Sequence, residues 1–224
     1  MRFRSVSIET NQRDPSQMYS LVKRFHTLAG LILVACSVLF LPACSERSPD
    51  WNLYDVKGHL PDLKFTLNGA NQKTWTEQDL KDQTVLLFFG YASCPDICPT
   101  TMAQLNEILV KLGDQAKNIK IVFVSVDPHR DTPEILQAYV NAFNPQAIGL
   151  TGDEKTISDL ARRYRVAYQI EKPKPGDSPD IYDVTHSRGV FVFDKNGDAR
   201  LLASDSENTD AFVEDLKKII QQTN

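Results

Sequence analysis

The sequence of 224 residues has little of several features that mark common protein classes. No run of Lys or Arg is longer than a pair and the formal net charge is -4, which argues against binding to nucleic acid. The sequence has no Gly-rich phosphate loop and no Gly-x-Ser-x-Gly elbow, so nucleotide-binding and hydrolase functions lose support. Four cysteines are too few for a disulfide scaffold. What remains is an ordinary globular composition, with 42% hydrophobic and 24% charged residues.

An apolar segment near the N-terminus predicts export from the cytoplasm. Residues 27–43 carry no charged side chain, and Lys23 and Arg24 precede them, as in a secretory signal. The segment ends in Leu-Pro-Ala-Cys, which resembles a bacterial lipobox. We therefore predict a lipoprotein signal peptide over residues 1–43 and a lipidated Cys44 that opens the mature chain.

Alternatives for this N-terminal region stay open. Cys36 ends a similar four-residue pattern, and the apolar segment is also long enough for an uncleaved membrane anchor. The residues before Met18 are polar and unlike a signal, so Met18 is an alternative translation start. Residues 44–59 have the composition of a tether. Residues 60–224 then form one domain on the periplasmic, oxidising side of the bacterial cell envelope.

The hydrophobic pattern beyond residue 60 predicts an α/β domain. Two apolar runs typical of buried strands flank an amphipathic helical pattern, which implies a parallel strand pair. Further helices and a hairpin around Asn196-Gly197 follow, and residues 171–183 read as a mobile loop. The predicted strands are 84–89, 121–126, 190–193 and 200–203, and the helices begin near residues 99, 133, 157 and 212. This order fits a thioredoxin-like fold with a central mixed sheet flanked by helices, and also other small α/β folds.

The clearest chemical feature is the pair Cys94 and Cys98, placed between the first predicted strand and its helix. A helix N-terminus stabilises a thiolate through its free N–H groups and dipole, so the thiol nearer to it should be the more acidic. Three intervening residues let the sulfurs form a disulfide or share one metal ion. The spacing alone does not decide between them, and an inert disulfide is the simplest alternative.

Two thiolates form an incomplete metal site, so we sought a third ligand among the histidines of the domain, His59, His129 and His186. His129 follows the second predicted strand, and His186 follows the mobile loop. Reasoning from the residues leaves these two nearly tied. Two soft thiolates and one imidazole suit Cu(I), and imidazole also serves Cu(II) when a carboxylate or water completes the shell.

Three motifs in order make the chain resemble the Sco/SenC family of thioredoxin-like copper proteins. They are FFGYASCPDICPTTM at residues 88–102, VSVDPHRDTPE at residues 124–134, and His186-Ser187. The resemblance covers about residues 60–220. It implies that Cys94, Cys98 and His186 are the copper ligands.

The same resemblance gives the remaining motif residues a structural role and shows one departure. Asp127, Arg130 and Asp131 are expected to order the loop beside the site. Thr185 stands where the family commonly has an aspartate before the histidine. Asp183 is the nearby carboxylate that would have to replace it.

The function implied by the resemblance is that of a copper metallochaperone that supports assembly of the binuclear copper site of cytochrome c oxidase. Its expected partners are the oxidase subunit that carries this site, other copper chaperones or thiol reductants, and the membrane through the lipid anchor. Such a protein transfers copper and is not an enzyme. The alternative is a thiol-disulfide oxidoreductase that keeps partner cysteines reduced, with Cys94 and Cys98 as its redox-active pair.

Overall fold

The computed structural model describes residues 49–204 and 208–222. The predicted signal peptide over residues 1–43, the lipidated Cys44 and the alternatives at Cys36 and Met18 therefore lie outside the described residues. In the part of the chain that is described, no helix is both long and apolar enough to cross a bilayer.

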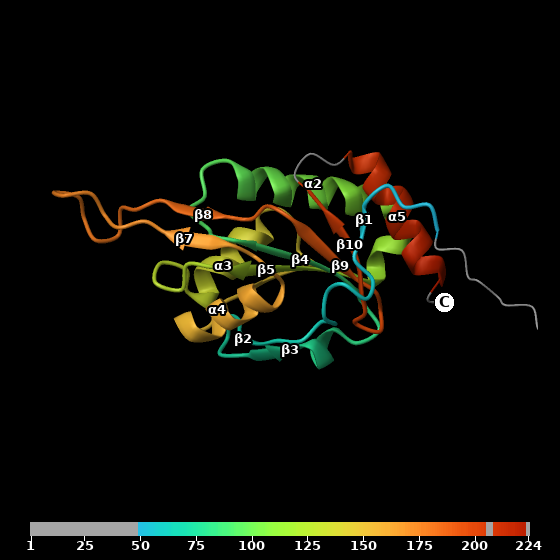
Figure 1. Ribbon diagram of the computed structural model, residues 1–224, viewed down its shortest axis with the longest axis horizontal. Helices are drawn as coiled ribbons and strands as arrows, with labels where there is room; N and C mark the ends of the chain where they lie inside the picture. The colour runs from blue at the N-terminus through green and yellow to red at the C-terminus, as the bar shows by residue number, and fades with distance from the viewer. Residues whose placement is uncertain (1–48, 205–207, 223–224) are drawn as a thin grey trace, which may run out of the picture. The chain divides into compact units, whose positions relative to one another are not determined.

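A mixed sheet of six strands forms the centre of the domain (Figure 1). Its strand order is β1-β10-β9-β4-β5-β6. Strands β4, β5 and β6 run parallel, whereas β9 is antiparallel to β4 and β10 is antiparallel to β9. The parallel pair and the hairpin predicted from the sequence are thus confirmed. The strands are β1 Tyr54–Asp55, β4 Thr84–Gly90, β5 Ile119–Ser125, β6 Ala147–Leu150, β9 Val190–Phe193 and β10 Ala199–Ala203.

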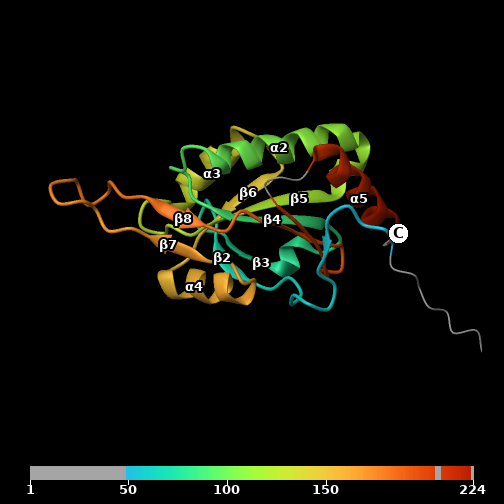
Figure 2. The ribbon, with the colours of Figure 1, turned by 45° about the horizontal axis from the view of Figure 1, so that its top comes forward.

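Helices cover both faces of this sheet. Figure 2 shows α2 and α3 over one face and α4 over the other, beside a hairpin of β2 and β3. The C-terminal helix α5 packs against α2. The arrangement is the mixed sheet flanked by helices that the sequence predicts. These elements are α2 Ile97–Leu112, α3 Pro133–Asn141, α4 Glu154–Arg163, α5 Thr209–Gln222, β2 Thr66–Asn68 and β3 Thr74–Thr76.

Strand β4 places the core on both sides of the sheet. All seven of its residues are buried, and their side chains alternate between the two faces. Phe88 packs against Phe123 with ring centroids 5.8 Å apart, and Phe89 packs against Tyr164 at 6.3 Å. The end of β4, from which the cysteine motif follows, is therefore fixed by packing on both faces.

A second small sheet, which the sequence pattern did not predict, carries the distant histidine motif. Strands β7 Tyr168–Ile170 and β8 Val184–His186 pair antiparallel through three residue pairs. They flank the predicted loop over residues 171–183. In Figures 1 and 2 this hairpin projects from one end of the domain.

The described part of the predicted tether packs on the domain. Residues from Asp50 onward belong to one compact unit, and β1 pairs with β10. The backbone N–H groups of Asn52 and Leu53 both donate to Oδ2 of Asp215, at 2.7 and 2.8 Å. This buried carboxylate on α5 gives polar backbone groups a partner that the composition of residues 44–59 did not reveal.

Candidate metal centre

The first two sulfur atoms come from the loop after β4 and the first turn of α2. Cys94 lies in the loop, and Cys98 is the second residue of the helix. Asp96 occupies the N-cap position, but its side chain makes no capping hydrogen bond. Instead, the backbone N–H of Cys98 donates to Sγ of Cys94 at 3.5 Å. The sulfur of Cys94 thus uses the free donors of the helix N-terminus.

The two thiols differ in acidity and burial. Burial alone would raise the pKa of the half-buried Cys94, but hydrogen bonds from the backbone of Cys98, Asp96 and Ile97 outweigh it and lower that pKa. Cys98 is fully buried, and this burial raises the pKa of its thiol strongly. The more acidic thiol is that of Cys94, which precedes the helix but whose sulfur accepts hydrogen bonds from the free N–H groups of its N-terminus, and it is also the more accessible one.

Gly90, the last residue of β4, makes room for the buried sulfur. A Cβ atom built at this position would lie 2.6 Å from Sγ of Cys98 and 3.0 Å from the ring of Phe123. Such contacts are too short for any side chain. The glycine therefore lets the helix bring Cys98 directly against the end of the strand.

His186, the last residue of β8, completes the group from far along the chain. Its Nε2 atom lies 3.4 Å from Sγ of Cys98, and its Nδ1 atom lies 2.8 Å from the carbonyl oxygen of Ser187. The second contact is a hydrogen bond when Nδ1 carries the proton, which leaves the lone pair of Nε2 toward the sulfur. Burial lowers the pKa of His186, with the Ser187 carbonyl acting in the opposite direction. The neutral ring is the form that binds metals.

The ligand atoms of Cys94, Cys98 and His186 all lie within 4.8 Å of one another. Among the described residues, no other group of three or more His, Cys, Asp or Glu side chains comes together in this way. The two cysteines are not joined by a disulfide in this structure. Two sulfurs and one imidazole nitrogen around one point form a soft donor set that suits copper, whereas structural zinc would take a fourth ligand.

The other candidate ligands lie elsewhere. His129 is exposed, and its Nε2 pairs with Glu154 at 2.6 Å. His59 and Asp183 are exposed, and neither belongs to the group of three. The structure thus separates the two histidines that reasoning from the residues left tied. The group that orients the imidazole of His186 is the backbone carbonyl of Ser187, and not a carboxylate.

Asp131 links the second motif to the cysteine loop. Its buried carboxylate accepts a hydrogen bond from the hydroxyl of Ser125 at 2.6 Å and one from the backbone N–H of Ala92 at 2.9 Å. Burial raises the pKa of this carboxyl, while both hydrogen bonds act in the opposite direction. The contacts fix the loop after β4 to the end of β5, in agreement with the structural role expected for Asp131.

Aromatic side chains that sequence reasoning did not assign to the site surround it. The rings of Phe88 and Tyr91 meet the imidazole of His186 edge-on, with centroids 6.0 and 5.9 Å away. Burial, followed by the neighbouring Cys94, raises the pKa of Tyr91 to about 12, so its hydroxyl stays protonated at neutral pH. The Phe-Phe-Gly-Tyr sequence before the cysteines carried this signal, since it puts aromatic residues at the end of a buried strand.

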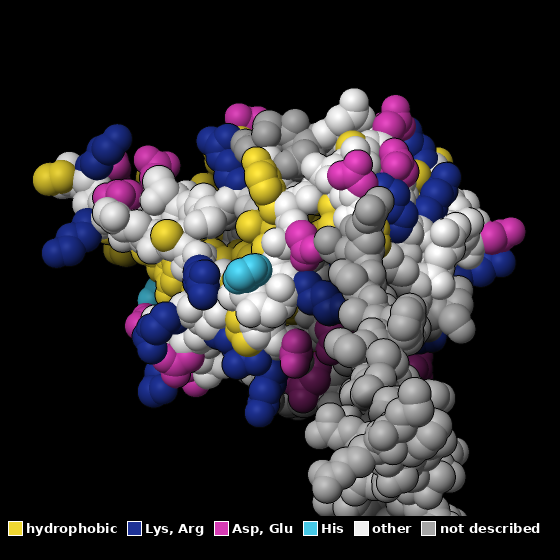
Figure 3. Space-filling view, turned by 45° about the vertical axis from the view of Figure 1, so that its right-hand side comes forward, with side chains coloured by type: hydrophobic (Ala, Val, Ile, Leu, Met, Phe, Trp, Pro, Cys, Tyr) yellow, Lys and Arg dark blue, Asp and Glu magenta, His cyan; other side chains and the backbone are white. Residues whose placement is uncertain are grey.

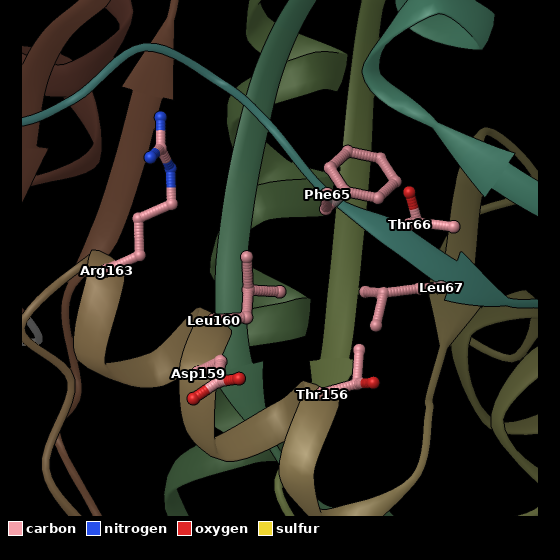
Figure 4. Close-up of a pocket in the computed structure, with 7 residues that line it drawn as sticks. All are labelled: Phe65, Thr66, Leu67, Thr156, Asp159, Leu160 and Arg163. Atoms are coloured by element: carbon pink, nitrogen blue, oxygen red, sulfur yellow. The ribbon is translucent and has the colours of Figure 1, made fainter.

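A separate pocket of about 260 Å³ lies between α4 and β2 (Figure 4). Its charged groups already have partners: Asp159 pairs with Lys155 at 2.6 Å, and Arg163 donates to the carbonyl of Asp62 at 2.9 Å. We assign no chemistry to it. The lining residues are Phe65, Thr66, Leu67, Thr156, Asp159, Leu160 and Arg163.

Comparisons with known proteins identify a family for this chain. A sequence model of the SCO1/SenC family matches residues 58–221. An SCO2-like protein of Rickettsia prowazekii is 33% identical over 170 residues, which cover 75% of this chain and 82% of that protein.

Two solved structures share the fold. Apo Sco1 of Thermus thermophilus is 36% identical with a TM-score of 0.63, and the match covers 70% of this chain and 90% of that one. Bradyrhizobium japonicum ScoI, solved with copper bound, is 33% identical with a TM-score of 0.62, and the match covers 70% and 98% of the two chains. Fold, motifs and family match lead to one conclusion: the chain is a member of the SCO1/SenC family.

Proposed function

We propose that this protein is a copper metallochaperone that binds one copper ion through Cys94, Cys98 and His186. The convergence of these three ligand atoms within 4.8 Å is the observation that carries the proposal. The similarity to Bradyrhizobium japonicum ScoI, a structure that contains copper, supports copper as the metal. Copper is here the cargo of the protein, and its acceptor is the binuclear copper site of cytochrome c oxidase.

The different exposure of the two sulfurs suits metal transfer. Cys94 is half-buried and lies in a loop, so a partner thiolate that binds the copper displaces Cys94 first. Cys98 is fully buried, so its sulfur is the last to leave the metal. Ligand exchange then proceeds stepwise, with the copper held by at least two donors throughout.

We also propose that the mature chain is lipidated at Cys44 and lies on the periplasmic side of the bacterial cell envelope. The support is the lipobox-like sequence before Cys44 and the apolar segment over residues 27–43. Partners in this compartment would be the oxidase subunit, other copper chaperones and thiol reductants.

A thiol-disulfide oxidoreductase is the second candidate, because the pKa of Cys94 is lowered. In that reaction the Cys94 thiolate attacks a disulfide of the partner, and Cys98 then displaces the partner thiol from the mixed disulfide. One protein disulfide is reduced while the Cys94 and Cys98 pair is oxidised. The raised pKa of Cys98 slows its attack as a resolving thiol, but copper binding also requires its deprotonation, so this pKa does not separate the two functions.

Anaerobic Cu(I) titration in competition with a chromogenic chelator separates the two functions. The protein is the full chain with Cys36→Ser and Cys44→Ser, purified in detergent and reduced, so that only the two motif cysteines remain. We expect one stoichiometric site that is weakened by Cys94→Ala, Cys98→Ala and His186→Ala, with His129→Ala as the matched control. Loose binding, or binding that ignores His186, would reject the chaperone in favour of the reductase.

A further inference from the structure

The hairpin that carries His186 ends in an exposed loop. Its two strands share only three residue pairs, and residues 171–181 between them are all exposed. Figure 3 shows acidic and basic side chains together on the part of the molecule that projects at the left of the view. This charged tip gives no apolar packing. The apolar contacts of the hairpin come from its strands, where Val184 is buried in the core, and polar contacts hold the point where the loop meets β8.

One such contact is a buried carboxylate directly after β5. Asp127 is fully buried, and its two oxygens have different partners. Oδ1 accepts a hydrogen bond from the hydroxyl of Tyr182 at 2.7 Å, and Oδ2 accepts one from Nε of Arg130. Tyr182 lies four residues before His186 on the strand side of the loop. The carboxylate therefore joins the end of the central sheet to the point where the loop over residues 171–183 meets β8.

Arg130 joins the same two parts a second time. Its Nη1 donates to the backbone carbonyl of Tyr182 at 2.9 Å and to that of Asp180 at 3.3 Å. Its guanidinium group also lies 3.8 Å from the centre of the Tyr182 ring and 5.6 Å from that of Tyr91. The Tyr91 ring in turn meets the imidazole of His186. We name Asp127, Arg130 and Tyr182 together the clamp.

The chemistry of the clamp favours a fixed geometry. Burial and the hydrogen bond to Asp127 raise the pKa of Tyr182 to about 12, so its hydroxyl is a permanent donor at neutral pH. In one orientation, the planar guanidinium of Arg130 donates to a carboxylate and two carbonyls and stacks on an aromatic ring. A flexible lysine does not reproduce these contacts. Removing one partner of a buried charged pair leaves the other uncompensated. The clamp is thus a stiff connection at the point where the exposed loop meets β8.

We propose that Asp127, Arg130 and Tyr182 are positioning residues, which fix the start of β8 so that Nε2 of His186 stays beside the two cysteine sulfurs. None of the three binds the metal. The inference rests on the proposed copper function, because it assigns the clamp a role in holding one ligand of that site.

A double-mutant cycle on Cu(I) affinity distinguishes positioning from a general contribution to folding. It uses the full-length Cys36→Ser, Cys44→Ser protein in detergent, with and without Tyr182→Phe and His186→Ala. Tyr182→Phe removes one hydroxyl and keeps the ring, and we expect it to weaken Cu(I) binding about tenfold. In the His186→Ala background the same change should have no further effect. Equal losses in both backgrounds, or no loss in either, would overturn the inference.

Amide hydrogen exchange of the copper-free protein tests the clamp without reference to the metal. We expect the amides of β7 and β8 to exchange faster in Tyr182→Phe and Arg130→Lys, while those of β4 keep their protection. Tyr54→Phe is the matched control, because Tyr54 is exposed on β1. Unchanged exchange in β8 would overturn the positioning role even if copper binds. A wild-type protein that binds no copper would overturn the proposed function. The exchange experiment would still show whether the clamp fixes β8.

Discussion

The cysteine loop and the β7–β8 hairpin bring ligands to the same point by different means. Cys98 is fixed by dense packing between the end of β4 and the first turn of α2, where even the space of one methyl group is missing. His186 lies on a projecting hairpin of three residue pairs, and its ring contacts the rings of Phe88 and Tyr91 and the carbonyl of Ser187. The sulfur pair is thus preformed by the core, whereas the imidazole depends on a few ring contacts and hydrogen bonds made by a projecting hairpin.

The largest expected effect concerns the two sulfurs within the cysteine loop. In the reduced, copper-free Cys36→Ser, Cys44→Ser protein, we expect iodoacetamide to alkylate Cys94, when Cys98 is replaced by serine, at least about a hundredfold faster than Cys98, when Cys94 is replaced by serine. The reason is that one pKa unit changes the thiolate fraction tenfold, and Cys98 is also buried. Mass spectrometry of timed samples measures both rates. Comparable rates would show that the helix N-terminus does not separate the two thiols.

The packing of the cysteine loop is tested by Gly90→Ala. The added methyl group would meet Sγ of Cys98 at 2.6 Å, so we expect a loss of about 1–3 kcal/mol in the free energy of unfolding and a weaker copper site. Gly152→Ala is the matched control, since its nearest contacts are at 3.3 Å. Urea unfolding and Cu(I) titration measure the two properties. If Gly90→Ala kept both, the close packing of the sulfur would be refuted.

The stability of the copper-free protein should depend on pH through His186 on the hairpin. Burial lowers the pKa of His186 below its ordinary value of 6.5, so the unfolded copper-free protein binds more protons than the folded one near that pH. The stability contributed by the neutral ring is present above pH 6.5 and is lost as the pH falls below it. Urea unfolding at several pH values should show a smaller decrease for His186→Gln than for wild type, with His59→Gln as control. Identical pH profiles would contradict a buried neutral imidazole.

The smallest effect is expected at the tip of the hairpin. Lys174 and Asp177 are exposed, and the contact between them is a backbone hydrogen bond. Replacing both side chains with alanine should change the free energy of unfolding by less than about 0.5 kcal/mol and leave Cu(I) affinity unchanged. A loss as large as that of Tyr182→Phe would mean that the tip of the loop, and not the clamp, positions His186.

The same comparison explains what could be predicted from the sequence. The strand at β4, the helix after it and the pair Cys94 and Cys98 follow from hydrophobic periodicity and local spacing, and the structure confirms the elements. His186 could not be separated from His129 by these means, because the choice depends on where β7 and β8 pair. The resemblance to a family supplied that information.

Other features could not be predicted because their cause lies far along the chain. Strands β6, β7 and β8 are short and give no clear alternating pattern. The segment after Asp50 looks like a linker by composition, and only the buried Asp215 on α5 explains why it packs on the domain. The family motif indicated a structural role for Arg130 and Asp127. That Tyr182 is their common partner follows only from the three-dimensional structure.

X-ray absorption spectroscopy at the copper edge tests the central claim most directly. The sample is the Cu(I)-loaded Cys36→Ser, Cys44→Ser protein, with His186→Ala measured in parallel. The account predicts two sulfur scatterers and one imidazole nitrogen in the wild-type site, and loss of the nitrogen in the variant. A site made of sulfur alone, or an unchanged spectrum in His186→Ala, would contradict it.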